Sequence, residues 1–269
     1  MKAICNILFS CSLICLASHS YADTSSTQGD VNAAKPNSTQ ITNGNAPAPA
    51  ASDDTEAKSP LTGNFDITTN YIFRGISNSN NNPAFQGGLT YTFLTNGIYL
   101  NVWGSNVDFP DPQGNTATVE ADTIIGISNS INDNWSYNIN FDRYNYPKAS
   151  AANYNEVIAA LTYKIFTATI GDSLNVYGSH SNGIYYNGLF AIPISEKIFH
   201  LSDLQAQASW GHYSLPRNAG LYSYSDVMVG LQKTIKQYVM ALQYTNTNHK
   251  AQMPGLDTGT LIATLTVNF

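Results

Sequence analysis

The sequence predicts an all-β fold: a transmembrane antiparallel β-barrel of about twelve strands, preceded by a disordered N-terminal periplasmic segment. Only 11% of the residues are charged, against roughly 25% in an average soluble domain. The mean hydropathy of −0.18 is nevertheless too low for a helical membrane protein. From Gly63 onward apolar and polar residues alternate, as they do in strands with one lipid-facing and one interior face.

The first 22 residues (1–22) are interpreted as a secretory signal peptide. Lys2 precedes an apolar run from Ile4 to Leu16, and Ser20-Tyr21-Ala22 places small residues where signal peptidase reads them. All three cysteines lie in this segment, so the mature chain is expected to contain no disulfide. A lipoprotein signal ending at Cys11 is the alternative, which the very short apolar run before Cys11 disfavours.

Residues 23–60 are predicted to be a disordered periplasmic tether. They are rich in Ser, Thr, Asn, Ala and Pro, and Val31 and Ile41 are their only large apolar residues, too few to form a core. The barrel is expected over residues 61–269. After the signal peptide no stretch approaches the ~18 apolar residues of a membrane helix. A closed barrel is then the remaining way to pair every backbone group within a membrane.

Short alternating segments define the predicted strands. In the first, Phe65, Tyr71 and Phe73 share one face, whereas Asp66 and Arg74 share the other. Several segments have about ten residues, the length that crosses a bilayer at a tilt of roughly 45°. The twelve predicted strands span residues 64–74, 84–94, 97–105, 118–129, 134–143, 154–164, 166–172, 184–193, 203–212, 223–232, 237–245 and 259–269.

The connections between these segments alternate between long and short. One short connection is Thr95-Asn96-Gly97, which contains the Asn-Gly pair typical of a tight hairpin. Outer-membrane barrels have short periplasmic turns and long outer loops, so the alternation supports this class of fold. The connection over residues 194–202 is longer than the rule predicts.

The last predicted strand ends on Phe269, with apolar residues at every second position back to Leu261. An alternating terminal strand that ends in an aromatic residue is typical of chains that the outer-membrane assembly machinery recognises. We therefore interpret Phe269 as an assembly signal.

Two segments carry a family resemblance. Tyr71–Ser77 (YIFRGIS), followed by Asn82–Gly88 (NPAFQGG), and Val102–Phe109 (VWGSNVDF) resemble the TorF-type porin family. The resemblance extends over roughly residues 63 to 190, and the tether is longer than is usual in such proteins. It implies an outer-membrane barrel of undefined substrate and supplies no catalytic residues.

Strand parity directs most strand charges into the barrel, where charge avoids lipid. Such an interior would be negative and would favour cations. In the alternative interpretation, Arg74 pairs with a neighbouring carboxylate and the other charges are solvated. Arg74 itself is either a cation at a constriction or a brace for the outer loop. The residues predicted to line the interior are Asp66, Arg74, Glu120, Asp122, Asp142, Glu156 and Asp226.

These features predict a porin-like channel in the bacterial outer membrane that passes small solutes, cations among them. A closed structural or adhesive barrel acting through its outer loops is the second hypothesis. An outer-membrane phospholipase-like hydrolase built on His212, Ser214 and Asn218 is a distant third. No cofactor, metal site or enzymatic activity is expected, and the pI near 5.2 argues against nucleic acid. The expected partners are outer-membrane lipid, the assembly machinery and small solutes, and the oligomeric state is left open.

Overall fold

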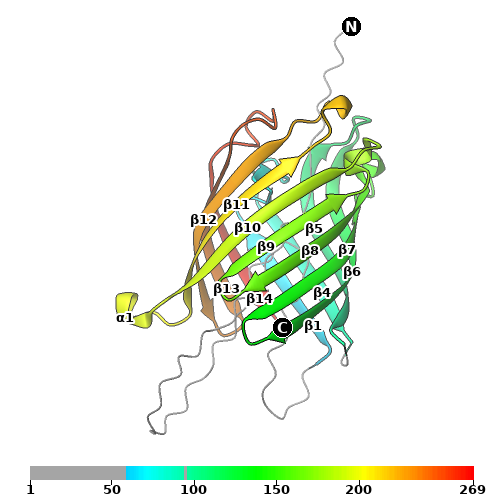
Figure 1. The fold of residues 1–269 in the computed structure, drawn as a ribbon. Coiled ribbons are helices and arrows are strands. Elements are labelled where there is room, and N and C mark those ends of the chain that lie inside the picture. The colour runs from blue at the N-terminus through cyan, green and yellow to red at the C-terminus, as the bar shows by residue number, and fades with distance from the viewer. Residues whose placement is uncertain (1–58, 94–95) are drawn as a thin grey trace, which may run out of the picture.

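The structure, a computed structural model, describes residues 59–93 and 96–269. The predicted signal peptide and nearly all of the tether therefore lie outside the described residues. Twelve strands form one closed antiparallel barrel in which each strand pairs with its neighbours along the chain and the last pairs with the first (Figure 1). The barrel strands are β1 (Leu61–Thr68), β4 (Ala84–Thr92), β5 (Ile98–Pro110), β6 (Thr116–Asn132), β7 (Trp135–Asn145), β8 (Tyr154–Tyr163), β9 (Phe166–Ser173), β10 (Gly183–Ile194), β11 (Leu204–Ser214), β12 (Tyr224–Ile235), β13 (Tyr238–Thr247) and β14 (Thr260–Asn268).

The predicted alternation becomes the two faces of the barrel wall. In β7, Ile139 and Phe141 are exposed on the outside, whereas Asn138 and Asn140 are buried inside. Successive side chains of a strand point to opposite faces, so one pattern of period two supplies both surfaces. The outside is apolar around the whole barrel, as lipid requires, and the prediction of a transmembrane barrel of about twelve strands is confirmed.

Aromatic side chains border the apolar outer surface at both ends of the strands. Aromatic girdles of this kind lie at the two interfaces of membrane barrels, so they mark the limits of the band that faces lipid. At the end with short turns the exposed aromatic residues are Tyr91, Phe93, Trp135, Tyr163, Phe190, Tyr238 and Phe269, and at the other end they are Phe85, Phe141, Tyr186, Trp210 and Tyr244.

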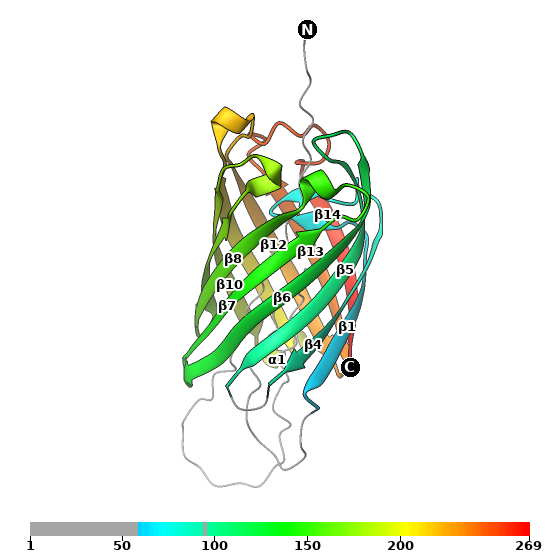
Figure 2. The same cartoon turned by 90° about the vertical axis from the view of Figure 1, so that its right-hand side faces the viewer.

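The long and short connections lie at opposite ends of the barrel (Figure 2). We call them the loop end and the turn end. Three 3-10 turns, η1 (Ser150–Ala152), η2 (Val176–Gly178) and η3 (Arg217–Ala219), lie at the loop end. At the turn end, the connection between β10 and β11 contains the short helix α1 (Glu196–Phe199) and extends beyond its neighbours (Figure 1). Among the described residues, no helix has the length and apolar character needed to cross a membrane.

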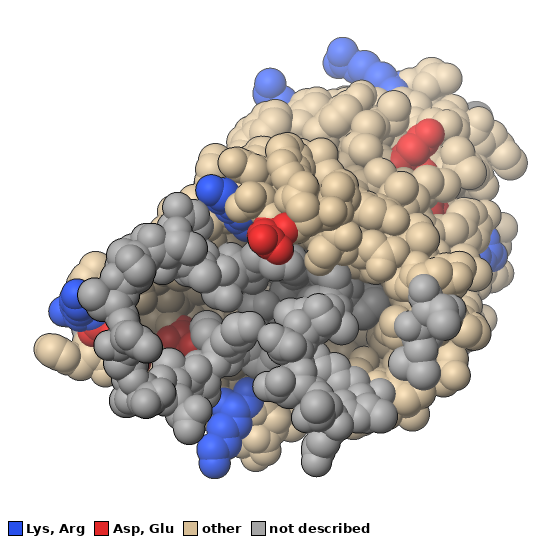
Figure 3. Space-filling view, turned by 60° about the horizontal axis from the view of Figure 1, so that its bottom comes forward, with Lys and Arg blue, Asp and Glu red and all other residues tan. Residues whose placement is uncertain are grey.

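Both ends carry exposed charge. Seen from the turn end, basic side chains stand around the rim (Figure 3). Lys164 and Lys236 lie in turns between strands, and Lys197 lies in α1. Basic residues at the strand ends stay outside the apolar band, where charge is tolerated.

The loop between β5 and β6 is compact. Its Asp111 carboxylate accepts hydrogen bonds from the backbone N–H groups of Gln113 and Asn115, at 2.9 and 2.8 Å. Burial raises the pKa of Asp111, but the hydrogen bonds from Asn115 and Gln113 outweigh it, and the pKa lies below its ordinary value. The ionised carboxylate therefore stabilises this loop in its folded form.

The prediction of a first strand over residues 64–74 is wrong in its second half. Strand β1 ends at Thr68, and Tyr71 and Phe73, predicted on the same face as Phe65, are instead buried inside the barrel. The side chain of Asn70 turns the chain inward. Its Oδ1 accepts hydrogen bonds from Ser77 Oγ at 2.6 Å and Ser79 Oγ at 3.0 Å. Local side-chain hydrogen bonds thus replace the backbone pairing expected for the second half of the predicted strand.

Candidate functional site: a hairpin folded into the barrel

Residues 70–82, which we call the inner hairpin, lie at the loop end of the barrel, where residues 70–79 are buried inside and residues 80–82 are exposed. Strands β2 (Ile72–Phe73) and β3 (Ile76–Ser77) pair only with each other and form no part of the wall. Arg74 and Gly75 connect them, both with positive φ (46° and 81°), which is typical of a two-residue type I′ turn. The hairpin therefore projects its tip, with Arg74, across the interior.

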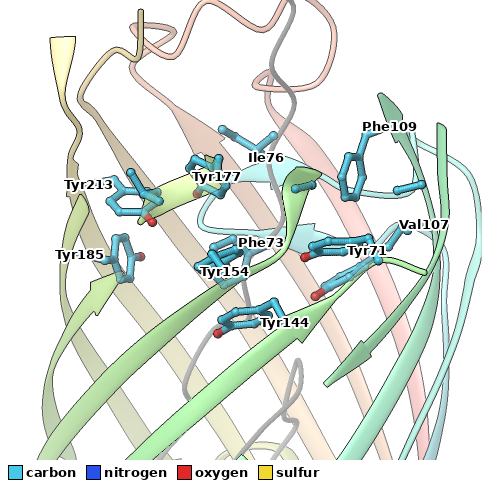
Figure 4. Close-up of a cluster of buried hydrophobic side chains, with 14 of the residues drawn as sticks. Tyr71, Phe73, Ile76, Val107, Phe109, Tyr144, Tyr154, Tyr177, Tyr185 and Tyr213 are labelled. Atoms are coloured by element: carbon cyan, nitrogen blue, oxygen red, sulfur yellow. The ribbon is translucent and has the colours of Figure 1, made fainter. Parts of the chain in front are cut away.

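A cluster of aromatic and aliphatic side chains surrounds the hairpin (Figure 4). Tyr71 makes an edge contact with Trp103 of β5, with ring centroids 5.7 Å apart. Tyr144 and Tyr154 of β7 and β8 stack at 4.4 Å. The cluster is a hydrophobic core within the loop end, and it fixes the hairpin against walls that are far apart around the barrel.

The Arg74 side chain is buried against the wall opposite β1. Its Nη2 donates to both carboxylate oxygens of Glu156 in β8, at 2.8 and 2.9 Å, and neither side chain is more than 1% exposed. The guanidinium carbon lies 4.1 Å from the ring centroid of Tyr185 and 4.5 Å from those of Phe73 and Tyr213. Three rings and a carboxylate thus hold one planar cation, a combination of cation–π and charge-assisted contacts.

Polar side chains of the wall support this arrangement. Glu156 also accepts hydrogen bonds from Ser173 Oγ at 2.8 Å and Tyr144 Oη at 3.1 Å. Tyr185 Oη donates to the carboxylate of Asp226, with 3.1 Å to each oxygen. The wall residues Glu156 and Tyr185, which contact Arg74, are therefore positioned by β7, β9 and β12, independently of the hairpin.

Three glycines make room for the tip. A Cβ at Gly171 would lie 2.8 Å from Glu156 Oε1 and 3.2 Å from Arg74 Nη2. A Cβ at Gly211 would overlap the Tyr185 hydroxyl, and one at Gly75 would lie 2.7 Å from Asp226 Cβ. Any larger residue at these positions would displace either the hairpin or its partners.

All seven residues predicted to line the interior are buried inside the barrel. The structure brings Arg74 together with Glu156. Asp142 is the register partner of Glu156 on β7, and Glu120 accepts a hydrogen bond from Tyr146 Oη at 3.1 Å. Asp66 lies elsewhere, where Asn64 donates to it at 2.6 Å. Arg74 was expected at the outer end of the first strand, and its place at the hairpin tip corrects that expectation.

Sequence reasoning missed the aromatic partners of Arg74. Tyr185 and Tyr213 come from strands more than a hundred residues away, and nothing local marks them as a pair. A signal was available only for the turn, because an Arg-Gly pair between apolar residues has the form of a two-residue hairpin. Not every strand charge points inward. Asp108, Arg143 and Asp172 lie on the outer face near the loop end, and Lys233 lies on the outer face near the turn end.

The residues of the hydrolase hypothesis do not assemble. His212 Nδ1 lies 2.9 Å from Ser225 Oγ on the neighbouring strand, and no hydrogen bond joins it to Ser214 among the described residues. Asn218 lies in η3, beyond the end of β11. The proposed arrangement of nucleophile and base is therefore absent in this part of the chain.

A family model described as "Bacterial protein of unknown function (Gcw_chp)" matches residues 53–264. The chain belongs to this family. No curated protein matches the chain. Among solved structures, a KdgM porin is 9% identical and covers 77% of this chain and 98% of its own, with a TM-score of 0.48. A NanC porin is 11% identical, with coverages of 78% and 98% and a TM-score of 0.46.

The outer membrane protein opdK from Pseudomonas aeruginosa is 10% identical, with coverages of 80% and 68% and a TM-score of 0.40. TM-scores below 0.5 at such identities carry no information about function. The functional argument therefore rests on the geometry of this chain.

Proposed function

We propose that the chain is a channel of the bacterial outer membrane that passes small solutes, with a preference for cations, through an interior narrowed by the inner hairpin. The resemblance of its opening segments to TorF-type porins, which the family match neither names nor excludes, is part of this proposal. The apolar outer surface with its two aromatic girdles supports the membrane location.

The polar interior wall carries the proposal. In the half of the barrel nearer the turn end, the inward side chains are mostly hydroxyls and amides. Removing such groups from water without giving them hydrogen bonds is costly. They are therefore suited to line a water-filled path rather than a dry core. This wall includes Thr90, Asn101, Ser128, Ser136, Asn138, Thr162, Thr167, Gln207, Gln232 and Thr264.

The inward charges support the preference for cations. Six carboxylates face the interior, and Arg74 is the only inward Lys or Arg on the described strands and inner hairpin. Glu156 binds the tip of the inner hairpin, Asp142 is its register partner and Asp226 lies beside Gly75, so a solute passing the hairpin would meet negative charge. Carboxylates at a narrow passage favour cations over anions.

A closed structural barrel is the second candidate, and one observation favours it. The inner hairpin and its aromatic cluster occupy the loop end, with Tyr71, Phe73 and Ile76 at most 1% exposed. A barrel closed in this way would act through its outer loops alone. Conductance separates the two functions.

The test is a planar-bilayer recording of the refolded full chain. We expect discrete openings, and in a salt gradient a reversal potential that shows cations to be more permeant than anions. The variant Asp122→Asn/Asp142→Asn should move the reversal potential toward zero, because it removes two interior charges while keeping side-chain size. Membranes that take up folded protein but show no openings would refute the channel and leave the closed barrel.

We also propose that Phe269 contributes to assembly. It is 70% exposed at the seam of the barrel, where its backbone N–H donates to Gly63 O at 2.9 Å. We expect Phe269→Asp to lower the folded outer-membrane population in cells several-fold, as measured by heat-modifiable mobility, while refolding into detergent persists. The control is Phe93→Asp, which places the same charge in the same aromatic girdle at the turn end, directly after β4. Equal losses in both variants would contradict a specific role of Phe269.

A further inference from the structure

The contacts of Arg74 have the composition of a binding site for an organic cation. We propose that the wall residues Glu156, Tyr185 and Tyr213, which we call the cation cage, bind solutes that carry a planar guanidinium group, and that Arg74 fills this site while the inner hairpin is in place. Binding of such a solute does not require the proposed channel. Only the consequence of binding rests on the proposed function, because a solute that displaces Arg74 would release the hairpin and widen the path through the barrel.

The cage recognises both the charge and the flat shape of its occupant. The Tyr185 and Tyr213 rings lie 4.1 and 4.5 Å from the guanidinium carbon, at the distance where a cation interacts with an aromatic face. Their two rings are inclined at 75°, with centroids 5.7 Å apart, so they form two sides of a box. Glu156 supplies the negative charge and two acceptor oxygens.

The cage keeps its form without the hairpin. Glu156 is held by Ser173 and Tyr144, and Tyr213 Oη lies 3.0 Å from Ser173 Oγ. These residues belong to β7–β11, each of which pairs with the next in a continuous antiparallel ladder. A site held by its own supporting hydrogen bonds is preorganised and gains affinity from that rigidity.

The wall also leaves space at this point. Gly171 lies beside the guanidinium, and a Cβ there would lie 3.2 Å from Nη2 and 2.8 Å from Glu156 Oε1. The cage therefore depends on a glycine in a strand interior, where glycine otherwise weakens a strand and often marks the close approach of a ligand or another backbone.

The occupant is separable from the site. The inner hairpin contributes Phe73 and Arg74, and its two short strands make no ladder with the barrel. Backbone hydrogen bonds from Ser77 N–H to Leu256 O and from Asp108 N–H to Asn78 O hold the hairpin at the loop end, so it leaves the cage by breaking these bonds and not the pairing of the barrel strands. A monoalkylguanidinium solute offers the same charge and the same donors as the Arg74 side chain, whereas urea has a similar planar shape without the charge.

The test uses Arg74→Gly in the refolded full chain, with methylguanidinium as the probe and titration calorimetry as the readout. Glycine suits the positive φ of position 74. We expect saturable binding with a millimolar Kd, and at least tenfold weaker binding to the wild-type chain, where Arg74 competes. The variant Arg74→Gly/Glu156→Gln and the probe urea should show no saturation.

Two further variants keep the test decisive. Arg217→Ala removes an exposed arginine with a single ring contact, to Tyr222, and should create no site. A chain whose residues 70–82 are replaced by Asn-Gly retains the cage on the barrel strands and should bind methylguanidinium even if Arg74→Gly fails to fold. Absence of saturable binding in every folded variant that lacks Arg74 overturns the cation cage.

Conductance then separates this inference from the proposed function. A chain that conducts but whose Arg74→Gly variant binds no methylguanidinium refutes the cage and leaves the channel. Saturable binding in a chain that never conducts supports the cage and refutes the channel. If both hold, millimolar methylguanidinium should alter the wild-type conductance, and urea should not.

Discussion

Replacing residues 70–82 by Asn-Gly will raise the single-channel conductance of the refolded chain several-fold. Thr68 and Ala84 are register partners on β1 and β4, so a short turn can join these strands without disturbing the ladder. The inner hairpin reaches from there to Glu156 on β8 and to Asp226 on β12. Its removal clears the interior of a twelve-stranded barrel, a size between side-chain-filled eight-stranded barrels and open sixteen-stranded porins.

The matched control is Pro112→Ala/Gln113→Ala, which changes two exposed residues at the same end of the barrel and leaves the interior untouched. Its conductance should equal that of the wild-type chain. If the chain without the inner hairpin also conducts like the wild type, the narrowest part of the path lies elsewhere, and the hairpin has no role in setting it.

The second large effect concerns the buried ion pair. Glu156→Ala leaves the Arg74 guanidinium buried among aromatic rings without its carboxylate. Breaking a buried pair by removing one partner typically costs about 3–5 kcal/mol. We expect a loss of about 3 kcal/mol in the free energy of unfolding, measured by urea titration in lipid vesicles.

A double-mutant cycle isolates the pair from other effects of each substitution. The losses in unfolding free energy for Arg74→Gly and Glu156→Ala should together exceed the loss for the double variant. The reason is that the double variant leaves neither charge buried alone. Arg217→Ala, at an exposed position, should change stability by no more than about 0.5 kcal/mol. Additive losses in the cycle would show that Arg74 and Glu156 are not coupled, contrary to the 2.8 Å contact.

Local alternation was sufficient to predict the barrel strands. All twelve segments predicted from the sequence overlap strands of the wall, the first of them only as far as Thr68. In β14 Leu261 lies outside and Thr264 and Thr266 lie inside, as expected, and Phe269 after it is exposed. The period of two is a property of the strand backbone, and lipid on one side makes it strict. A strand can therefore be predicted from this pattern without knowing which distant residues it contacts.

The same rule failed where the chain leaves the wall. Tyr71 and Phe73 continue the alternation of β1, so their sequence pattern is that of lipid-facing residues. Their actual position depends on two features that the alternation does not reveal. The Asn70 network turns the chain inward, and the interior of twelve strands has room for a hairpin.

Along the barrel strands, the sequence by itself determined which face most residues take, and hence that Glu156 is an interior charge. It placed Arg74 inward on a strand that ends before it, at Thr68. Only the tertiary structure decided that Arg74 and Glu156 meet, and that Tyr185 and Tyr213 enclose them. Strand parity fixes the face of a side chain but not its height or its partner across the barrel. Those are set by strand register and closure, which bring β8, β10 and β11 to the wall opposite the hairpin.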